Sequence, residues 1–410
     1  MIAISTSCEV PATISADAAT RCDWEVIVIG AGPAGAATAW RLGAGGIRVL
    51  LVDRHAFPRA KICGCCLSPQ AVCELSDLGP DALPAAAIPL ESVLLAHGRR
   101  SAAVPLPAGR VLSRDALDPH LLRRAIAAGC HWLPGVHVAS VADTGTSHAL
   151  ITASTSGESL TLRGEFVVVA TGIADHVRVA GHNPCSDDGR TIAAASRIGV
   201  GGVLAAESCA LPAGRLVMVV GRSGYCGLVR LEDGRIDVAA ALDRGAVAEA
   251  RTMNAALTAL LAEAVDAGSC PLPDGAAISA APLHATPPLT RCAPPVAGRG
   301  CRVLRVGDAG RYVEPFTGEG IGWALAAARI LAAAMLTPHG LREPAEAAAR
   351  YRASHHREFA AAHARCRRVA ATLRHPAIVA AAIVGARALP WAARLLMPAV
   401  IGSTPRGATA

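Results

Sequence analysis

The stretch from residue 25 to residue 53, EVIVIGAGPAGAATAWRLGAGGIRVLLVD, decides the fold. Its first five residues, 25–29, form a short β-branched run that predicts a buried parallel strand. Residues 36–42 predict a helix, and residues 49–52 predict a second strand that ends in an acid. A strand, a helix and a strand in this order make the βαβ unit that a Rossmann-type fold requires.

The glycines at the turn of this unit predict a dinucleotide-binding site. Gly30 allows the tight turn, Gly32 lets the backbone approach a pyrophosphate, and Gly35 lets helix and strand pack closely. The helix N-terminus adds free N–H groups and partial positive charge. Asp53, 23 residues after the first glycine, can accept hydrogen bonds from a ribose diol. The predicted binding turn comprises Gly30, Ala31, Gly32, Pro33, Ala34 and Gly35.

A second glycine-rich segment near the C-terminus narrows the expected cofactor to a flavin. Residues 306–310, VGDAG, end a predicted strand in Asp308, and residues 314–325, EPFTGEGIGWAL, open another helix. Asp308 would bind ribityl or ribose hydroxyls. N–H groups of the helix start would point at the N1–C2=O edge of an isoalloxazine, which becomes anionic on reduction. The helix-start residues in this prediction are Gly318, Gly320 and Ile321.

The rest of the chain predicts an antiparallel sheet inserted into the nucleotide-binding fold. Asp233-Gly234 between two strand-like runs is a strong hairpin signal. The fold class is therefore α/β, a Rossmann-type FAD-binding domain with an inserted antiparallel substrate domain and a C-terminal helical segment. The predicted boundaries are a disordered tail at 1–22, an FAD-binding domain at 23–80, 111–180 and 283–345, a substrate domain at 81–110 and 181–282, and a helical region at 346–410.

The composition excludes several classes of protein. With 52% apolar and 17% charged residues, the 410-residue chain is globular rather than disordered. The net charge of +7 is dispersed, which argues against nucleic-acid binding. Residues 1–22 lack the pattern of a signal peptide, so we expect a cytoplasmic protein. Cys63-Gly64-Cys65-Cys66 with Cys73 lacks paired CxxC spacing, so we expect no metal site.

One basic residue differs from all the others. Of the 39 basic residues, every one except Lys61 is arginine. A composition that has replaced nearly every lysine suggests that this position needs an ammonium group, although chance survival would give the same count. Composition alone leaves both readings open.

These motifs together resemble the FAD-dependent aromatic hydroxylases, geranylgeranyl reductases and flavin-dependent halogenases. The resemblance covers roughly residues 23–345, and the order of the motifs is specific for this superfamily but much less so for the reaction. The residues that carry it are those at 30–35, Asp53-Arg54, the run from Phe57 to Gly64, Leu67-Ser68-Pro69, Ser113-Arg114, Gly307-Asp308-Ala309 and Pro315 to Gly320.

The resemblance implies roles for residues between the two glycine-rich segments. Arg54 and Arg114 would flank the FAD phosphates and ribose, and Val138 would lie against the adenine. Lys61 would hold a phosphate or an anionic group of the substrate. Cys63 would either donate a proton, as in the reductases, or merely pack. These two are the predicted catalytic residues.

One departure from the family leaves the electron donor open. Many hydroxylases of this family carry an Asp-Gly pair after the third strand, and this chain has Thr171-Gly172 there. Gly172 still suits close approach to the cofactor. NAD(P)H remains the expected donor, but no second glycine fingerprint indicates a separate nicotinamide domain.

The predicted function is an FAD-dependent oxidoreductase. The first expectation is a monooxygenase of secondary metabolism that hydroxylates a hydrophobic aromatic or polyketide-like molecule. The alternatives are a reductase that saturates isoprenoid C=C bonds, a halogenase, for which the usual tryptophan signature is missing, and a non-enzymatic flavin-binding module. The C-terminal helices mix arginine with apolar residues, so they would either lie on a membrane surface or form a cap over the substrate domain.

Overall fold

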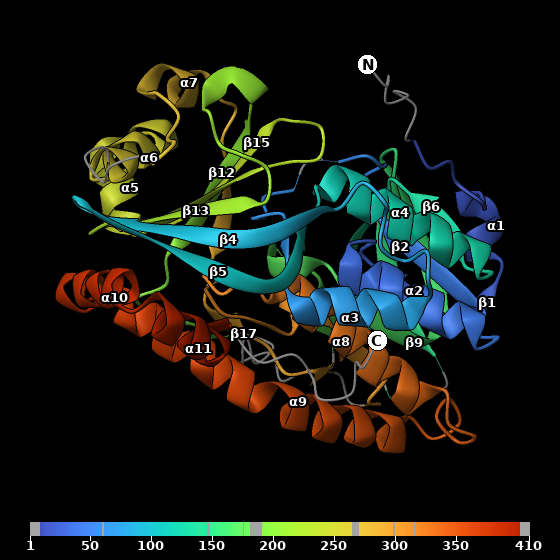
Figure 1. Ribbon diagram of the computed structural model, residues 1–410. Helices are drawn as coiled ribbons and strands as arrows, with labels where there is room; N and C mark the ends of the chain where they lie inside the picture. Colours follow the sequence, from blue (N-terminus) through green and yellow to red (C-terminus); the bar gives the residue numbers. More distant parts are fainter. Residues whose placement is uncertain are drawn as a thin grey trace.

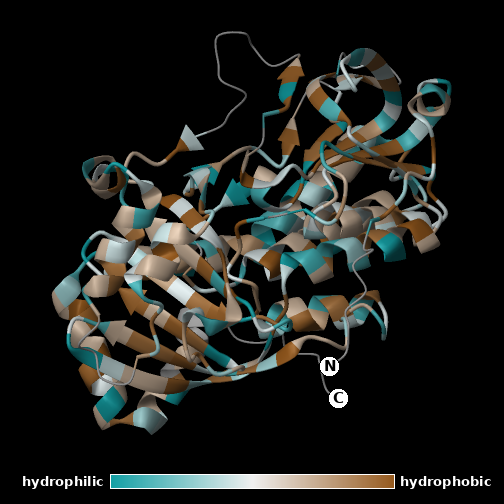
Figure 2. Cartoon of the chain, turned by 90° about the horizontal axis from the view of Figure 1, so that it is seen from above, coloured by the Kyte–Doolittle hydropathy of each residue, from teal (hydrophilic) through white to brown (hydrophobic). Residues whose placement is uncertain are grey.

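The computed structural model contains two large sheets and a layer of C-terminal helices that runs beneath both (Figure 1). It describes residues 9–59, 61–143, 145, 148–174, 176–180, 191–264, 270–297, 300–314 and 316–401. Strands of both sheets carry mainly hydrophobic residues, whereas the helices show alternating hydrophilic and hydrophobic bands (Figure 2). The mixed α/β architecture predicted from the sequence is confirmed.

The first sheet is built around the predicted βαβ unit. β1 runs parallel to β2 on one side and to β9 on the other, and β9 is parallel to β19. Alternate residues of β1 enter two hydrophobic cores, with Val26 and Val28 on one face and Ile27 and Ile29 on the other. The strands of this sheet are β10 (Arg178–Ala180), β7 (His137–Ala142), β8 (Ala149–Thr155), β9 (Glu158–Val169), β1 (Asp23–Ile29), β2 (Val49–Asp53) and β6 (His131–Pro134), with β18 (Val296–Ala297) and β19 (Val303–Arg305) beside β9.

Three helices pack together on one face of this sheet. Their shared core contains Leu42, Leu121 and Leu331, all fully buried. α8 carries apolar residues almost all round, as expected for a helix enclosed by other elements. The helices are α2 (Pro33–Ala44), α4 (Arg114–Ala127) and α8 (Gly320–Met335), with α3 (Pro69–Leu78) against α8.

The second sheet is mostly antiparallel and confirms the predicted hairpin. β14 and β15 pair antiparallel, and Arg230 lies opposite Ile236 next to the turn. In the turn, the Arg235 N–H donates to Asp233 Oδ1 at 3.0 Å. The strands in spatial order are β16 (His284–Pro288), β12 (Ile198–Leu204), β15 (Ile236–Leu242), β14 (Gly224–Arg230), β13 (Arg215–Val220), β4 (Ile88–His97), β5 (Arg100–Val111) and β3 (Cys66–Leu67). A small sheet of β11 (Thr191–Ile192), β17 (Arg291–Cys292) and β20 (Arg311–Tyr312) lies apart from both.

Helices lie on both sides of the second sheet (Figure 1). Leu257 and Leu260 of α6 pack against one face, and Val379 and Ile383 of α10 belong to the core on the other. α9 runs from beneath the first sheet toward the second (Figure 1), and the bend between α9 and α10 is 102°. These helices are α5 (Arg244–Ala250), α6 (Met253–Ala262), α7 (Gly275–Ala280), α9 (Pro344–Thr372), α10 (Pro376–Ala388) and α11 (Pro390–Ile401).

Two features differ from the predicted boundaries. Residues 9–22 are packed rather than loose, because Val10 is buried, its carbonyl accepts from Trp132 Nε1 at 3.1 Å, and α1 forms at Ala16–Thr20. The remaining tail residues, 1–8, lie outside the described residues. β3 and β16 pair within the second sheet, although the predicted boundaries assign them to the FAD-binding domain. Among the described helices, none is by itself long and apolar enough to span a membrane.

Candidate active site

A single large cavity joins the two sheets and the C-terminal helices. Its volume is about 1240 Å³, which exceeds the roughly 300–1,000 Å³ of an ordinary small-molecule site. The predicted cofactor-binding and catalytic residues converge on it from distant parts of the chain. Those that line it are Gly30, Gly32, Pro33, Ala34, Asp53, Arg54, Lys61, Cys63, Arg114, Val138, Gly172, Asp308, Gly318, Gly320 and Ile321. Ala31 and Gly35 are absent from the lining and act within the turn itself.

The glycine turn requires glycine for steric reasons. Gly30 has φ +102°, and a Cβ there would lie 2.5 Å from the carbonyl oxygen of Ala170. A Cβ on Gly35 would lie 1.8 Å from the carbonyl oxygen of Gly30. The Ala31 N–H donates to Asp53 Oδ2 at 2.8 Å, which ties the turn to the end of β2. Helix α2 begins after Gly32 without a side-chain cap, so its first N–H groups can receive an anion.

Two arginines face this turn. A Cβ on Gly32 would lie 3.5 Å from Arg114 Nη2 and 3.6 Å from Arg59 Nη2. Arg114 donates two hydrogen bonds to Asp118, at 2.7 and 2.6 Å, which fix its guanidinium group. Arg59 Nη2 lies 3.7 Å from both Asp53 and Asp118, and its Nε is buried without a partner among the described residues. Spare donors beside a helix N-terminus suit a pyrophosphate.

Arg59 and Asp118 were missed as site residues by the sequence reasoning. Arg59 lies inside the run from Phe57 to Gly64 that carries the family resemblance, so a signal for it was present. Asp118 lies one helical turn after Arg114, where a carboxylate at i+4 can hold an arginine. That spacing is common on helices, and only the fold shows that the pair faces the turn.

The opposite side of the cavity is shaped for a flavin ring. A Cβ on Gly318 or Gly320 would meet no atom within 4 Å, and helix α8 begins after Glu319 without a side-chain cap. Lys61 Nζ is 3.4 Å from the Cβ position of Gly172. Burial lowers the pKa of Lys61, and the charges of Arg114 and Arg59 lower it further. Open backbone, a helix N-terminus and the convergent cations fit FAD, which would supply two-electron redox chemistry there.

Burial of Asp308 makes the stability of the FAD-free protein depend on pH. Burial raises the pKa of Asp308 from 3.8 to about 6, while Lys61 and Arg114 oppose that shift. The folded state therefore binds the carboxyl proton more tightly than the unfolded state does. The stability gained from this proton is fully present below pH 3.8 and is lost as pH rises through about 6.

We expect Asp308→Asn to raise the melting temperature of the FAD-free protein above pH 6. The gain over wild type should shrink as pH falls toward 4, because the wild-type carboxyl is then neutral too. Differential scanning calorimetry of both proteins across this range measures the effect. A gain independent of pH would contradict the assignment. The same substitution should weaken FAD retention, since it removes an acceptor for cofactor hydroxyls.

Three thiols and a carboxyl lie together on the wall between the cofactor and substrate ends. A hydrogen bond from the Cys65 thiol and the charge of Arg114 lower the pKa of Cys63 to about 6, although burial opposes them. Burial raises the pKa of Cys66 and of Asp237 above their ordinary ranges. All four side chains line the cavity. The surroundings of Cys63 therefore favour its thiolate form.

The substrate end is largely apolar and includes one buried tyrosine. Tyr225 is buried, and its hydroxyl has no hydrogen-bond partner in the described part of the chain. Its ring meets Phe316 edge-on at 5.1 Å, and the Arg197 guanidinium lies 5.6 Å from its centroid. An unpaired hydroxyl on an apolar wall gives this end one polar group that a substrate could meet.

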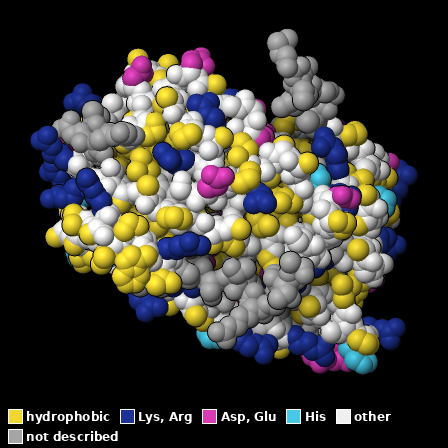
Figure 3. All heavy atoms as spheres, in the orientation of Figure 1, with side chains coloured by type: hydrophobic (Ala, Val, Ile, Leu, Met, Phe, Trp, Pro, Cys, Tyr) yellow, Lys and Arg dark blue, Asp and Glu magenta, His cyan; other side chains and the backbone are white. Residues whose placement is uncertain are grey.

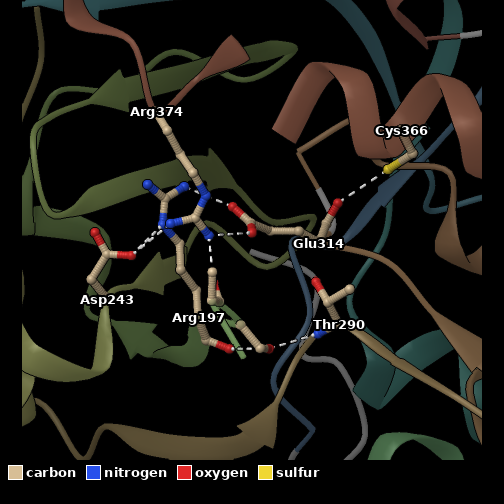
Figure 4. Close-up of polar contacts among 8 residues, drawn as sticks. Arg197, Asp243, Thr290, Glu314, Cys366 and Arg374 are labelled. Atoms are coloured by element: carbon tan, nitrogen blue, oxygen red, sulfur yellow. Dashed lines mark hydrogen bonds and ion pairs between the residues drawn. The ribbon is translucent and has the colours of Figure 1, made fainter. Parts of the chain in front are cut away.

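A buried cluster of charges joins the C-terminal helices to the cavity wall (Figure 4). Arg197 Nη1 lies 2.7 Å from Glu314 Oε1, and both side chains are at most 2% exposed. Asp243 accepts from Arg197 Nε at 3.0 Å and from Arg374 Nη1 at 3.1 Å. Arg374 also reaches Glu314 at 3.4 Å, and Cys366 Sγ donates to the Glu314 carbonyl at 3.2 Å. The cluster therefore fixes the end of α9 against the second sheet.

Comparison with known proteins agrees with this geometry. Residues 23–195 match the family described as FAD binding domain. A menaquinone reductase of Mycolicibacterium smegmatis is 29% identical over 357 residues, which cover 79% of this chain and 78% of that enzyme. A geranylgeranyl diphosphate reductase of Rhodobacter capsulatus is 30% identical over 157 residues, which cover 38% of this chain and 39% of that enzyme.

The fold also occurs outside the reductases. The flavin-dependent halogenase CmlS superposes with a TM-score of 0.67 at 21% identity, over 86% of this chain and 64% of that chain. Identity at this level shows the fold alone, and the fold is shared by different flavin reactions. The FAD binding domain match covers the glycine turn, Asp53 and Arg114. Residues 23–195 are therefore similar to the FAD binding domain family, and the chain is an FAD-dependent oxidoreductase.

Proposed function

We propose that this enzyme is a reductase that saturates C=C bonds in the isoprenoid chain of a hydrophobic substrate. The observation that carries the proposal is the apolar arm of the cavity between the second sheet and the C-terminal helices. Its walls are aliphatic over several elements, as a polyprenyl chain requires. The residues of this arm are Leu95, Leu106, Leu216, Met218 and Val220 from the sheet, and Val369, Leu373, Ile378, Val379, Ala382, Ile383 and Met397 from α9 to α11.

The matched reductases support the same choice. One relative is a menaquinone reductase and the other a geranylgeranyl diphosphate reductase, and both substrates named there are hydrophobic isoprenoids. A hydroxylase of aromatic or polyketide-like molecules, the first expectation from the sequence, has only the shared fold in its favour.

The side chains around the cofactor end have distinct roles in this proposal. Arg59 and Arg114 bind the pyrophosphate beside the α2 N-terminus. Lys61 is placed beside Gly172, where it would orient the flavin or an anionic substrate group. Cys63, a thiol on the cavity wall, would hold the proton that an alkene carbon receives. The aliphatic arm keeps water from the reacting carbons. NAD(P)H remains the expected electron donor.

Anaerobic turnover tests the proposal directly. Holoenzyme reduced with dithionite is mixed with geranylgeranyl diphosphate or menaquinone in the absence of oxygen. We expect the oxidised flavin absorbance to return and the product to gain two hydrogens. A flavin that stays reduced with both substrates, yet reoxidises with oxygen in a substrate-dependent way, would overturn the reductase and favour a monooxygenase.

The outer surface of α10 and α11 fits contact with an anionic membrane surface, and we propose this contact as the route of substrate supply. Figure 3 shows hydrophobic side chains with arginines beside them over these helices, at the lower left. Residues 376–401 contain two arginines and no acid. Ile378 both lines the cavity and is 50% exposed, so the apolar surface is continuous with the interior. The exposed apolar side chains are Ile378, Val384, Leu389, Trp391 and Leu395.

We expect Trp391→Ser combined with Leu395→Ser to weaken binding to phosphatidylglycerol vesicles by at least about 10-fold. Burying one such side chain contributes about 1.5–3 kcal/mol, and both are now largely exposed, at 65% and 72%. Vesicle co-sedimentation measures the effect. The matched control is Leu150→Ser, because Leu150 is 44% exposed on β8, away from these helices. Equal vesicle binding by wild type, the double variant and Leu150→Ser would contradict a membrane contact at α10 and α11.

A further inference from the structure

Asp237 is a buried acid on the cavity wall to which the proposed function assigns no role. Along β15, Ile236 and Val238 enter the core under α6, while Asp237 and Ala239 line the cavity. Period-two alternation thus turns the carboxyl toward the substrate space. Asp237 is 5% exposed, and its Oδ2 has no hydrogen-bond partner among the described residues. A buried carboxyl without full pairing is costly, so its presence calls for a function.

The Cys65 thiol connects this carboxyl to Cys63. The Cys65 Sγ donates to the Cys63 carbonyl oxygen at 3.8 Å, and the thiol interacts with both the Asp237 carboxyl and the Cys63 sulfur closely enough to shift their pKa values. A thiol has one proton for these two acceptors, so it can serve only one at a time and can pass a proton between them. Cys65 itself is 3% exposed and has φ +51°, a conformation rare for a non-glycine residue.

The groups around Asp237 decide whether the carboxyl of Asp237 or the sulfur of Cys63 holds the proton more tightly. The titratable and charged groups that face it are Cys63, Cys65 and Cys66 from the loop and β3, Asp115 from α4, Cys226 from β14 and Arg235 from the turn before β15. Burial and the negative charge of Cys63 raise the pKa of Asp237, whereas Arg114 lowers the pKa of Cys63. These surroundings favour the neutral Asp237 carboxyl together with the Cys63 thiolate over the opposite distribution of the proton.

We propose that Asp237 supplies the proton of the reaction and that this proton reaches Cys63 through the thiol of Cys65. The inference rests on the proposed alkene reduction. Asp237 gives its proton to Cys65, Cys65 gives its own proton to the Cys63 thiolate, and the Cys63 thiol formed in this way protonates one alkene carbon. The other carbon would receive the hydride that bound reduced FAD supplies, and the C=C π bond breaks. The alkene gains two electrons, and FAD returns to its oxidised form. Cys63 is left as the thiolate, Cys65 as the thiol and Asp237 as the carboxylate, which solvent reprotonates.

The first test measures the oxidative half-reaction of Asp237→Asn. Holoenzyme is reduced with dithionite, and reoxidation by geranylgeranyl diphosphate or menaquinone is followed anaerobically by stopped flow. We expect a rate about 100-fold lower, the effect of losing a positioned acid, and loss of the fall in rate that wild type shows at high pH. The matched control, Asp233→Asn, removes a carboxylate of the same hairpin that lies outside the cavity and should leave the rate unchanged. An unchanged rate and pH profile in Asp237→Asn would overturn the proposal.

A second variant keeps the test decisive if Asp237→Asn folds poorly. Cys65→Ala interrupts the relay while Asp237 remains, so it should slow reoxidation to a similar degree. The double variant should be no slower than the slower single variant, because both changes cut one path. Multiplied effects would mean that the two residues act independently and would contradict a relay.

A readout without substrate separates this inference from the proposed function. The pH dependence of Cys63 alkylation by iodoacetamide is followed on the holoenzyme by peptide mass mapping. In wild type, ionisation of Asp237 should broaden the curve, whereas Asp237→Asn should give a single titration near pH 6. Superimposable curves would refute the coupling. If wild type reduces neither isoprenoid, the proposed function fails, yet these curves still decide whether Asp237 and the thiols share a proton.

Discussion

Replacing Gly35 with alanine should give a protein that does not retain FAD. The new methyl group would lie 1.8 Å from the carbonyl oxygen of Gly30 and 3.1 Å from Cβ of Ala170, both in rigid segments. Because backbone cannot yield as a flexible side chain can, α2 must move away from β1. The first N–H groups of α2 then leave the pyrophosphate position. Flavin absorbance per mole of purified protein measures the loss.

A matched substitution separates this effect from the general effect of alanine. Gly245 lies in helix α5, and a Cβ there would meet no atom within 4 Å. Gly245→Ala should therefore retain FAD and gain up to about 1 kcal/mol of stability, as alanine favours helix. FAD content equal to wild type in Gly35→Ala would show that the turn does not hold the cofactor as described.

Replacing Glu314 with glutamine should lower the free energy of unfolding by about 3–5 kcal/mol. The change removes the anion that pairs with Arg197 at 2.7 Å, and Arg197 is only 1% exposed. The remaining partner, Asp243, is 36% exposed and compensates weakly. A buried cation without its counter-ion is far more costly than an exposed pair. Chemical denaturation followed by circular dichroism measures the difference.

The same change should loosen the end of α9, because Arg374 loses its contact with Glu314. Hydrogen exchange at residues 366–375 should rise accordingly. Asp17→Asn is the control, since the Asp17–Arg21 pair at 2.6 Å is 70–75% exposed and should contribute at most about 1 kcal/mol. Equal destabilisation by the two substitutions would contradict the role given to the cluster in Figure 4.

The cofactor end of the site was predictable because its signals are local. The turn at 30–35, Asp53 and the start of α8 each lie at the junction of two adjacent elements, so spacing alone places them. The structure brings Asp308 and the glycine turn to one cavity, although 278 residues separate Gly30 from Asp308. Parallel pairing of β1, β9 and β19 explains this, because the carboxyl ends of parallel strands meet at one edge.

The long strands β4 and β5 were less predictable. Prolines at 89, 105 and 107 are unfavourable inside a paired strand, yet the structure has strands of 10 and 12 residues here. β3 pairs with β5 only at residues 110 and 111, so most of the outer edge of β5 has no neighbour in the described sheet. Proline costs no ladder hydrogen bond on such an edge. Sequence alone cannot show which strand lies at the edge.

The substrate end depended on contacts between distant segments. Arg197, Asp243, Glu314 and Arg374 lie in four separate segments, and nothing in their local sequence indicates an ion pair. Asp237 sits in an ordinary strand pattern, and only the sheet topology turns it toward the thiols. The aliphatic arm likewise needs α10 to fold back onto β4 and β5. For this reason the sequence favoured hydroxylation, while the cavity favours a polyprenyl substrate.

The most direct test of the central claim is the mass of the product formed under ¹⁸O₂. Holoenzyme is supplied with NADPH and geranylgeranyl diphosphate or menaquinone, and the product is analysed by mass spectrometry. Alkene reduction predicts a product heavier by two hydrogens and free of ¹⁸O. A product that carries ¹⁸O, with every C=C bond intact, would contradict a reductase.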